Sequence, residues 1–170
     1  MALLLPAATP APAAAAKCAK AGAHPADISR KAVKKATLCL LNKRRRAHDR
    51  RKLKPNRRLA KAARRHARDM VKKDYFAHDS PTGVDFVDRI LDTDYVEKAA
   101  GWVLGENLAW GSHELATPRS IVRAWMKSPG HRENILNGKF REIGVGIVRG
   151  APEPGVSRAA TYATEFGTRY

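Results

Sequence analysis

The chain has 170 residues, of which 44% are hydrophobic, and it carries a formal net charge of +17. This length fits one globular domain with a tail, and the apolar content excludes global disorder. No apolar run approaches the ~18 residues of a membrane span, which excludes a spanning helix within this sequence.

The first 17 residues, MALLLPAATPAPAAAAK, resemble the end of a secretory signal, with a short apolar run followed by small residues. Either the true start lies upstream, or the segment is an Ala/Pro linker. We favour a secreted, extracellular protein with an incomplete signal. The domain boundaries expected are a flexible N-terminus over 1–17, a basic extension over 18–35 and one folded domain over 36–170.

Cys18 and Cys39 are the two cysteines of the chain. Two cysteines in an exported protein favour one disulfide, which would tie the start of the folded part to the first helix. The alternative is two free thiols.

The positive charge is concentrated in the first half. Residues 1–73 hold 22 Lys and Arg against 3 Asp and Glu, whereas residues 74–170 hold 11 against 13. Such a region is expected to face an anionic partner, and we predict that it holds the protein at anionic envelope polymers or phospholipid head groups. Nucleic acid is the alternative partner, and a solvated face without any partner is the third interpretation. Aromatic residues for base stacking are not interleaved with the arginines, so specific nucleic-acid binding is not expected.

Periodicity predicts helices first and strands last. The helices expected lie at 28–50, 57–73 with Asn56 as N-cap, 84–92, 118–126 and 131–136, and the strands at 143–148 and 160–167. Residues 101–111 are punctuated by glycines and are interpreted as a loop. This order predicts an α+β layered domain that ends in a two-stranded hairpin.

Three polar residues in turn-rich segments are candidates for chemistry: His78, Glu106 and His131. Two imidazoles and a carboxylate can bind a divalent cation, or they can act as a general acid–base group. Neither function follows from the spacing alone. Ser80 and Ser128 could be nucleophiles beside the histidines, but a turn or N-cap role is the preferred interpretation.

Other residues have structural interpretations. His66 lies on an apolar helix face and is expected in the core, as is Trp125. Gly144 and Gly146 within a strand indicate close approach of a helix. His24, His48 and His113 are interpreted as exposed and without a role.

Five ordered motifs resemble a known family. They are Tyr75-Phe76-x-His78-x-Ser80-Pro81-x-Gly83, Gly105-Glu106-Asn107-Leu108-Ala109-x-Gly111, Trp125-Met126-x-Ser128-Pro129-Gly130-His131-Arg132-x-Asn134-Ile135-Leu136, Ile143-Gly144-Val145-Gly146 and Phe166-Gly167. This set resembles the bacterial branch of the CAP superfamily, whose SCP domains include cysteine-rich secretory, antigen 5 and pathogenesis-related type-1 proteins. The resemblance covers about residues 36–168.

The resemblance implies an α-β-α sandwich with a largely antiparallel sheet and a cleft lined by a His/Glu/Glu/His tetrad that binds cations in some members. Matched by motif, the tetrad residues are His78, Glu106 and His131, with Ser128 at the place of the second Glu. Asn107 and Asn134 would position the neighbouring Glu106 and His131. The ligands of a zinc, calcium or magnesium ion would then be His78, Glu106 and His131, one anionic ligand fewer than the tetrad provides.

Three functions follow as expectations. The first is a secreted, monomeric module whose cleft binds a ligand such as a lipid, a sterol or a peptide, with or without a divalent cation. The second is a peptidase-like hydrolase that uses His78, Glu106 and His131. The third is a basic nucleic-acid-binding protein. No enzymatic activity follows from the fold that the resemblance implies.

Overall fold

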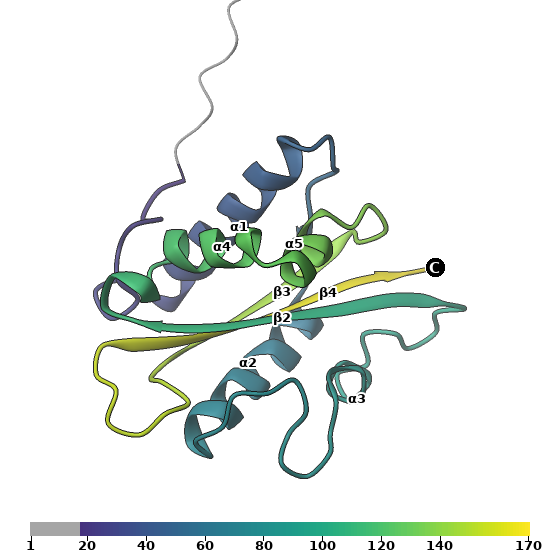
Figure 1. Cartoon of the computed structure of the whole chain (residues 1–170). Coiled ribbons are helices and arrows are strands. Elements are labelled where there is room, and N and C mark those ends of the chain that lie inside the picture. The colour runs from purple at the N-terminus through teal and green to yellow at the C-terminus, as the bar shows by residue number, and fades with distance from the viewer. Residues whose placement is uncertain (1–17) are drawn as a thin grey trace, which may run out of the picture.

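The computed structural model describes residues 18–170 and has three layers (Figure 1). A four-stranded sheet lies between α1, α4 and α5 on one face and α2 and α3 on the other, which confirms the α-β-α arrangement. The expected tail, 1–17, lies outside the described residues. The elements are α1 (Arg30–Arg46), β1 (Lys54–Pro55), α2 (Arg57–Lys72), α3 (Phe86–Leu91), β2 (Trp102–Ser112), the 3-10 helix η1 (His113–Ala116), α4 (Pro118–Lys127), α5 (Pro129–Leu136), β3 (Glu142–Arg149) and β4 (Ala159–Arg169).

The strand order is β1-β3-β4-β2, with β1 parallel to β3 and the other two pairs antiparallel. The predicted hairpin is the β3–β4 pair. The long β2–β4 register places Glu106 opposite Glu165, while β3 places Gly144 on the other side of Glu165. The sheet therefore places two acidic residues, 59 positions apart in the chain, directly opposite each other on adjacent strands.

Helix α2 packs directly on β3 because two glycines leave room for it. A Cβ atom at Gly144 would lie 2.0 Å from the carbonyl carbon of Leu59, and one at Gly146 would lie 2.3 Å from that of Ala63. These distances confirm the close approach that the two strand glycines predict.

The predicted helix cap is also confirmed, since the Asn56 side chain accepts hydrogen bonds from the first turn of α2.

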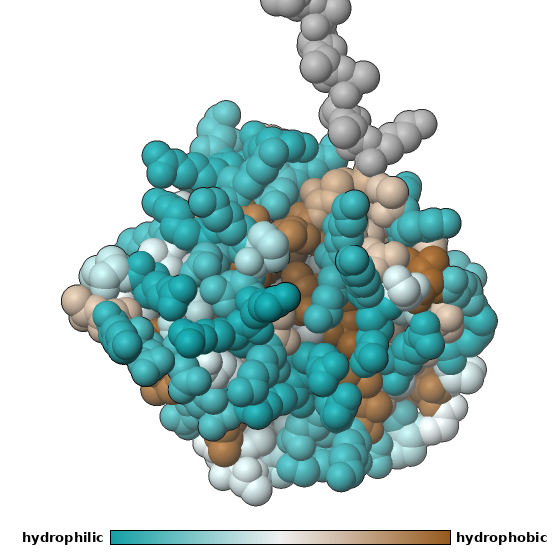
Figure 2. Space-filling view, turned by 180° about the vertical axis from the view of Figure 1, so that it is seen from behind, coloured by the Kyte–Doolittle hydropathy of each residue, from teal (hydrophilic) through white to brown (hydrophobic). Residues whose placement is uncertain are grey.

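The main core lies on the opposite face of the sheet. Trp125 of α4 is buried, and its indole nitrogen donates to the Leu108 carbonyl at 2.8 Å. The rings of Phe140 and Phe166 stack beneath α5, with centroids 5.3 Å apart. The outer surface is mostly hydrophilic in the rear view, with hydrophobic side chains surfacing toward the middle (Figure 2). None of the described helices is both long and apolar enough to cross a membrane.

A buried arginine ties α1 to the loops beyond α5. Arg45 is 0% exposed, and its guanidinium donates to the carbonyls of Arg51, Ile135, Asn137 and Phe140 at 2.7 to 3.3 Å. Burial, followed by the nearby charges of other arginines, lowers the pKa of Arg45 to about 10, so it remains a cation at neutral pH. The most basic segment of the sequence thus contributes one arginine to the interior.

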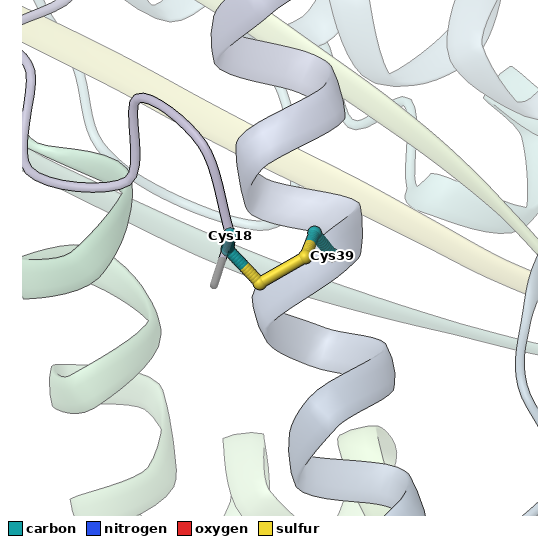
Figure 3. Close-up of a disulfide and its surroundings, with 2 residues drawn as sticks. All are labelled: Cys18 and Cys39. Carbon is teal, nitrogen blue, oxygen red and sulfur yellow. A yellow bond between two sulfur atoms is a disulfide. The ribbon is translucent and has the colours of Figure 1, made fainter. Parts of the chain in front are cut away.

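The predicted disulfide is present between Cys18 and Cys39, and it fastens the segment before α1 to the middle of that helix (Figure 3). No free cysteine occurs among the described residues.

Three expectations are corrected. The segment 101–111 is not a loop but most of β2, because its glycines serve close packing rather than turns: a Cβ at Gly105 would lie 2.8 Å from the Phe140 ring. The first helix ends at Arg46, before the turn that leads into β1. His24 is not exposed but 8% accessible, since its ring lies 2.9 Å from the Arg158 carbonyl.

Candidate functional site

The loop that carries His78 is anchored to α2. The Nε2 atom of His66 lies 2.9 Å from the Ala77 carbonyl, to which it donates, and the Tyr75 hydroxyl donates to Asp69 at 2.7 Å. Burial lowers the pKa of His66, so it is neutral at pH 7. His66 is thus the core histidine that the sequence predicts, and it fixes the loop that precedes His78.

Ser80 shapes the next turn. Its hydroxyl accepts from the Val84 backbone N–H at 3.0 Å, and its carbonyl accepts from Gly83, which has φ +80°. Gly83 suits this left-handed conformation because it has no side chain. The turn interpretation of Ser80 is therefore confirmed.

Glu106 and His78 are in direct contact. The Nδ1 atom of His78 donates to Glu106 Oε1 at 2.7 Å. The Glu106 side chain is 1% exposed, whereas that of His78 is 56% exposed. The hydrogen bond to Glu106 raises the pKa of His78, although its partial burial acts in the opposite direction. A buried carboxylate therefore orients an imidazole whose outer part reaches solvent.

Arg89 of α3 completes this contact, which the sequence did not predict. Its guanidinium donates to the second oxygen of Glu106 at 2.9 Å, and to the backbone carbonyls of His78 and Val84 at 2.8 Å each. The Arg89 side chain is only 9% exposed. Arg89 therefore compensates the buried charge of Glu106 and holds both ends of the 78–84 loop against β2.

Glu165, the cross-strand neighbour of Glu106, is a second residue that the sequence reasoning missed. Its carboxyl group is buried, and neither oxygen has a hydrogen-bond partner among the described residues. Burial, and then the negative charge of Glu106, raise the pKa of Glu165 well above its usual value. Burial also acts to raise the pKa of Glu106, but the hydrogen bond from His78 and the positive charge of Arg89 outweigh burial and lower it. These opposite directions favour the negative charge on Glu106 and the neutral form of Glu165.

His131 lies on the first turn of α5 and makes different contacts. Its Nδ1 atom lies 2.8 Å from the Ser128 hydroxyl. Ser128 occupies the N-cap position of α5, but its hydroxyl binds this ring instead of a backbone N–H. Burial lowers the pKa of His131, and the positive charge of His78 lowers it further. No hydrogen bond or ion pair joins His131 to His78 or Glu106 in the described part of the chain.

Two asparagines connect α5 to β2. The amide of Asn107 donates to the His131 carbonyl at 3.0 Å, and the amide of Asn134 donates to the Glu106 carbonyl and to Asn107 Oδ1 at 3.0 Å each. These bonds fix the backbone of both Glu106 and His131. Each asparagine thus binds the backbone of the residue on the other element, Asn107 that of His131 and Asn134 that of Glu106, and their role in a functional site stays a prediction.

The arrangement does not fit the three-ligand cation site that the resemblance implies. Both oxygens of Glu106 are bound, one by His78 and the other by the positive guanidinium of Arg89. Across residues 18–170, no group of three or more His, Cys, Asp or Glu side chains is positioned to hold a metal ion. The contact of His78 with Glu106 and Arg89 can supply hydrogen bonding and proton exchange at the His78 ring.

A cavity of about 260 Å³ lies between α2 and the 78–84 loop. Arg89, His66 and Ser80 line it together with Thr82, Val84, Arg65, Asp69 and Lys73. His78, Glu106 and His131 do not line this cavity, so a hollow shared by those three residues stays a prediction.

Sequence comparison identifies the family. A model of the cysteine-rich secretory protein family, CAP, matches residues 38–162. The chain belongs to the CAP family. It is 39% identical over 141 residues to the uncharacterised protein YkwD of Bacillus subtilis, a match that covers 83% of this chain and 51% of that protein. The chain thus spans about half the length of this relative.

Solved structures place it with the bacterial SCP domains. An extracellular protein of Bacillus anthracis that contains an SCP domain matches with a TM-score of 0.61 and 27% identity, over 82% of this chain and 43% of that one. An outer surface protein of Borrelia burgdorferi has the same fold, with a TM-score of 0.70 and 22% identity over 84% of this chain and 97% of its own. This CAP domain therefore has the bacterial form of the fold.

Proposed function

We propose that this CAP domain is an exported binding module that takes its ligand at His78. The observation that carries the proposal is the contact of a buried carboxylate, Glu106, with an imidazole that is 56% exposed. A charge sealed into a domain costs free energy unless it is compensated, and here Arg89 compensates it. The cluster keeps one face of His78 oriented toward solvent.

The chemistry of His78 indicates the ligand group. Because Nδ1 donates to Glu106, the outward Nε2 of the protonated ring is a hydrogen-bond donor, and that of the neutral ring is an acceptor. The raised pKa of His78 favours the protonated form. We therefore propose that the ligand presents a carbonyl or carboxylate oxygen, as peptides and lipids do.

Export is supported by two observations. A disulfide closes the segment from Cys18 to Cys39, and disulfides persist in oxidising compartments. The similar protein from Bacillus anthracis is described as extracellular.

The test is a titration of 15N-labelled protein with an N-acetylated tripeptide, its C-terminal amide and oleate, observed at the histidine ring nitrogens. We expect the Nε2 signal of His78 to shift on binding, and His78→Ala to abolish binding. His48→Ala, at an exposed histidine of the basic segment, is the matched control. Shifts that leave His78 unchanged, or equal binding by both variants, would place the ligand elsewhere. Release of product from the peptide would indicate hydrolysis instead.

A further inference from the structure

A larger cavity lies away from the His78 cluster, on the other side of the sheet. It measures about 600 Å³, is open to solvent, and lies between α1, α4 and the segment next to the disulfide. In the described part of the chain it is lined by Cys18, Ala19, Ala21, Leu40, Lys43, Arg44, Arg119, Val122 and Arg123.

Four of these lining residues are cations, two from α1 and two from α4, and none is a carboxylate. None of the four forms an ion pair with any residue of the range 18–170, since the ion pairs found there involve other side chains. Some exposed arginines elsewhere, such as Arg58, Arg65 and Arg158, have acidic partners, and others, such as Arg57, have none among the described residues. The cavity differs in gathering four such cations around one hollow. Uncompensated charges around a hollow focus a positive potential into it, and this potential attracts anions.

The cavity is held in shape by covalent and hydrogen bonds. The Cys18–Cys39 disulfide fixes one wall to α1 (Figure 3). The Arg119 backbone N–H donates to the Ala21 carbonyl at 2.8 Å, which fixes the same wall to α4. A wall anchored at both sides loses little conformational freedom on binding, and preorganisation of this kind favours affinity.

The lining also indicates which anion fits. Among residues 18–170, no aromatic residue or histidine lines the cavity, so these residues offer no platform for stacking bases. The cations surround a hollow instead of forming a flat patch, which suits a chain of phosphates better than a membrane surface. A second cavity of about 520 Å³ is also mostly basic, with one carboxylate, and is lined by Arg51, Lys52, Lys54, Arg141, Glu142, Thr168 and Arg169. The two cavities lie at either end of the stretch 43–54, which has eight basic residues and one acidic one.

We propose that the cavity beside the Cys18–Cys39 disulfide binds a linear phosphate polymer without bases, such as a phosphodiester chain of a cell envelope. Arg119 and Arg123 contact the phosphates from α4, and Lys43 and Arg44 contact them from α1. The site shares no residue with the His78 cluster, so either proposal can fail without the other.

The test measures the affinity for short-chain inorganic polyphosphate by titration calorimetry at physiological salt. The decisive variant is Arg119→Gln/Arg123→Gln, and the matched control is Arg57→Gln/Lys61→Gln, which removes the same charge from exposed positions on α2. We expect the cavity variant to weaken binding by roughly tenfold or more, because both arginines line the cavity. The control should weaken it by less than about twofold, because Arg57 and Lys61 do not line the cavity and act only through long-range attraction that salt screens. Cys18→Ser/Cys39→Ser should also weaken binding, because the wall is released.

Equal losses in the two double variants would overturn the proposal, because net charge alone would explain the binding. Tighter binding to phosphatidylglycerol vesicles or to a single-stranded oligonucleotide than to polyphosphate would overturn it as well. So would the absence of binding by the unmodified protein. Thermal unfolding of each variant checks that the fold is intact.

Discussion

Glu106 and Glu165 lie opposite each other on β2 and β4, and both side chains are buried. Side chains at directly opposed positions point to the same face of a sheet, so the two carboxyl groups are neighbours. Two adjacent carboxyl groups in the interior do not both ionise near neutral pH. The domain thus keeps one neutral acid beneath the His78 contact.

Replacement of that acid should change how stability depends on pH. The pKa of Glu165 is raised in the folded state, so its contribution to stability is fully present below the unfolded pKa and declines as the pH rises toward the folded pKa. Glu165→Gln removes this decline. We expect Tm at pH 7 to rise by roughly 3 °C or more, with little change at pH 3. Scanning calorimetry of both proteins at pH 3 and pH 7 measures the change in Tm. An equal change at the two pH values would contradict a raised pKa of Glu165 in the folded state.

Loss of Arg89 should expose the cost of the buried charge. Arg89→Met leaves Glu106 without its cation and frees the 78–84 loop. We expect the free energy of unfolding to fall by about 3–5 kcal/mol, as for other broken buried pairs. The double variant Arg89→Met/Glu106→Gln should recover much of this loss, because no charge remains uncompensated. Denaturant unfolding gives both values, and simple additivity of the two single changes would refute the coupling.

Addition of one methyl group at β3 should be disruptive. A Cβ at Gly144 would lie 2.0 Å from backbone atoms of α2, which cannot rotate away. Gly144→Ala should destabilise the domain by about 3 kcal/mol or more. Gly130→Ala in α5 is the matched control, because apart from its own helix backbone and chain neighbours no atom lies within 4 Å of the added Cβ, and it should be neutral or stabilising. Similar chemical denaturation midpoints for the two variants would argue against the α2–β3 contact.

The contribution of the buried Arg45 to stability can be tested by comparing substitutions at Arg45 and at its exposed neighbour Arg46. Arg45→Met removes donors from four backbone carbonyls, whereas the side chain of Arg46 is exposed. We expect Arg45→Met to cost about 3 kcal/mol, and Arg46→Met less than about 0.5 kcal/mol. Hydrogen exchange in 135–141 should accelerate only in the first variant. Unchanged protection there would show that other contacts hold this segment.

Local patterns predicted most of the helices well, because these helices have a side-chain cap or an apolar stripe of their own. Asn56 and the buried face of α2 are examples. The same patterns failed at β2, where burial on both faces removes the alternation and glycines look like turns. They also missed Arg89 and Glu165, since only the tertiary fold brings residues from α3 and β4 to Glu106. A charged residue within the apolar run of β4 was the one signal that could have identified Glu165.

The glycine contact between α2 and β3 has a consequence for motion. With backbone against backbone at Gly144 and Gly146, this helix has no soft side-chain layer over which to slide or roll. On this face of the sheet, adjustment to an arriving molecule is therefore expected in the segment between α2 and α3. A few polar bonds hold that segment, so it can shift without disrupting the core.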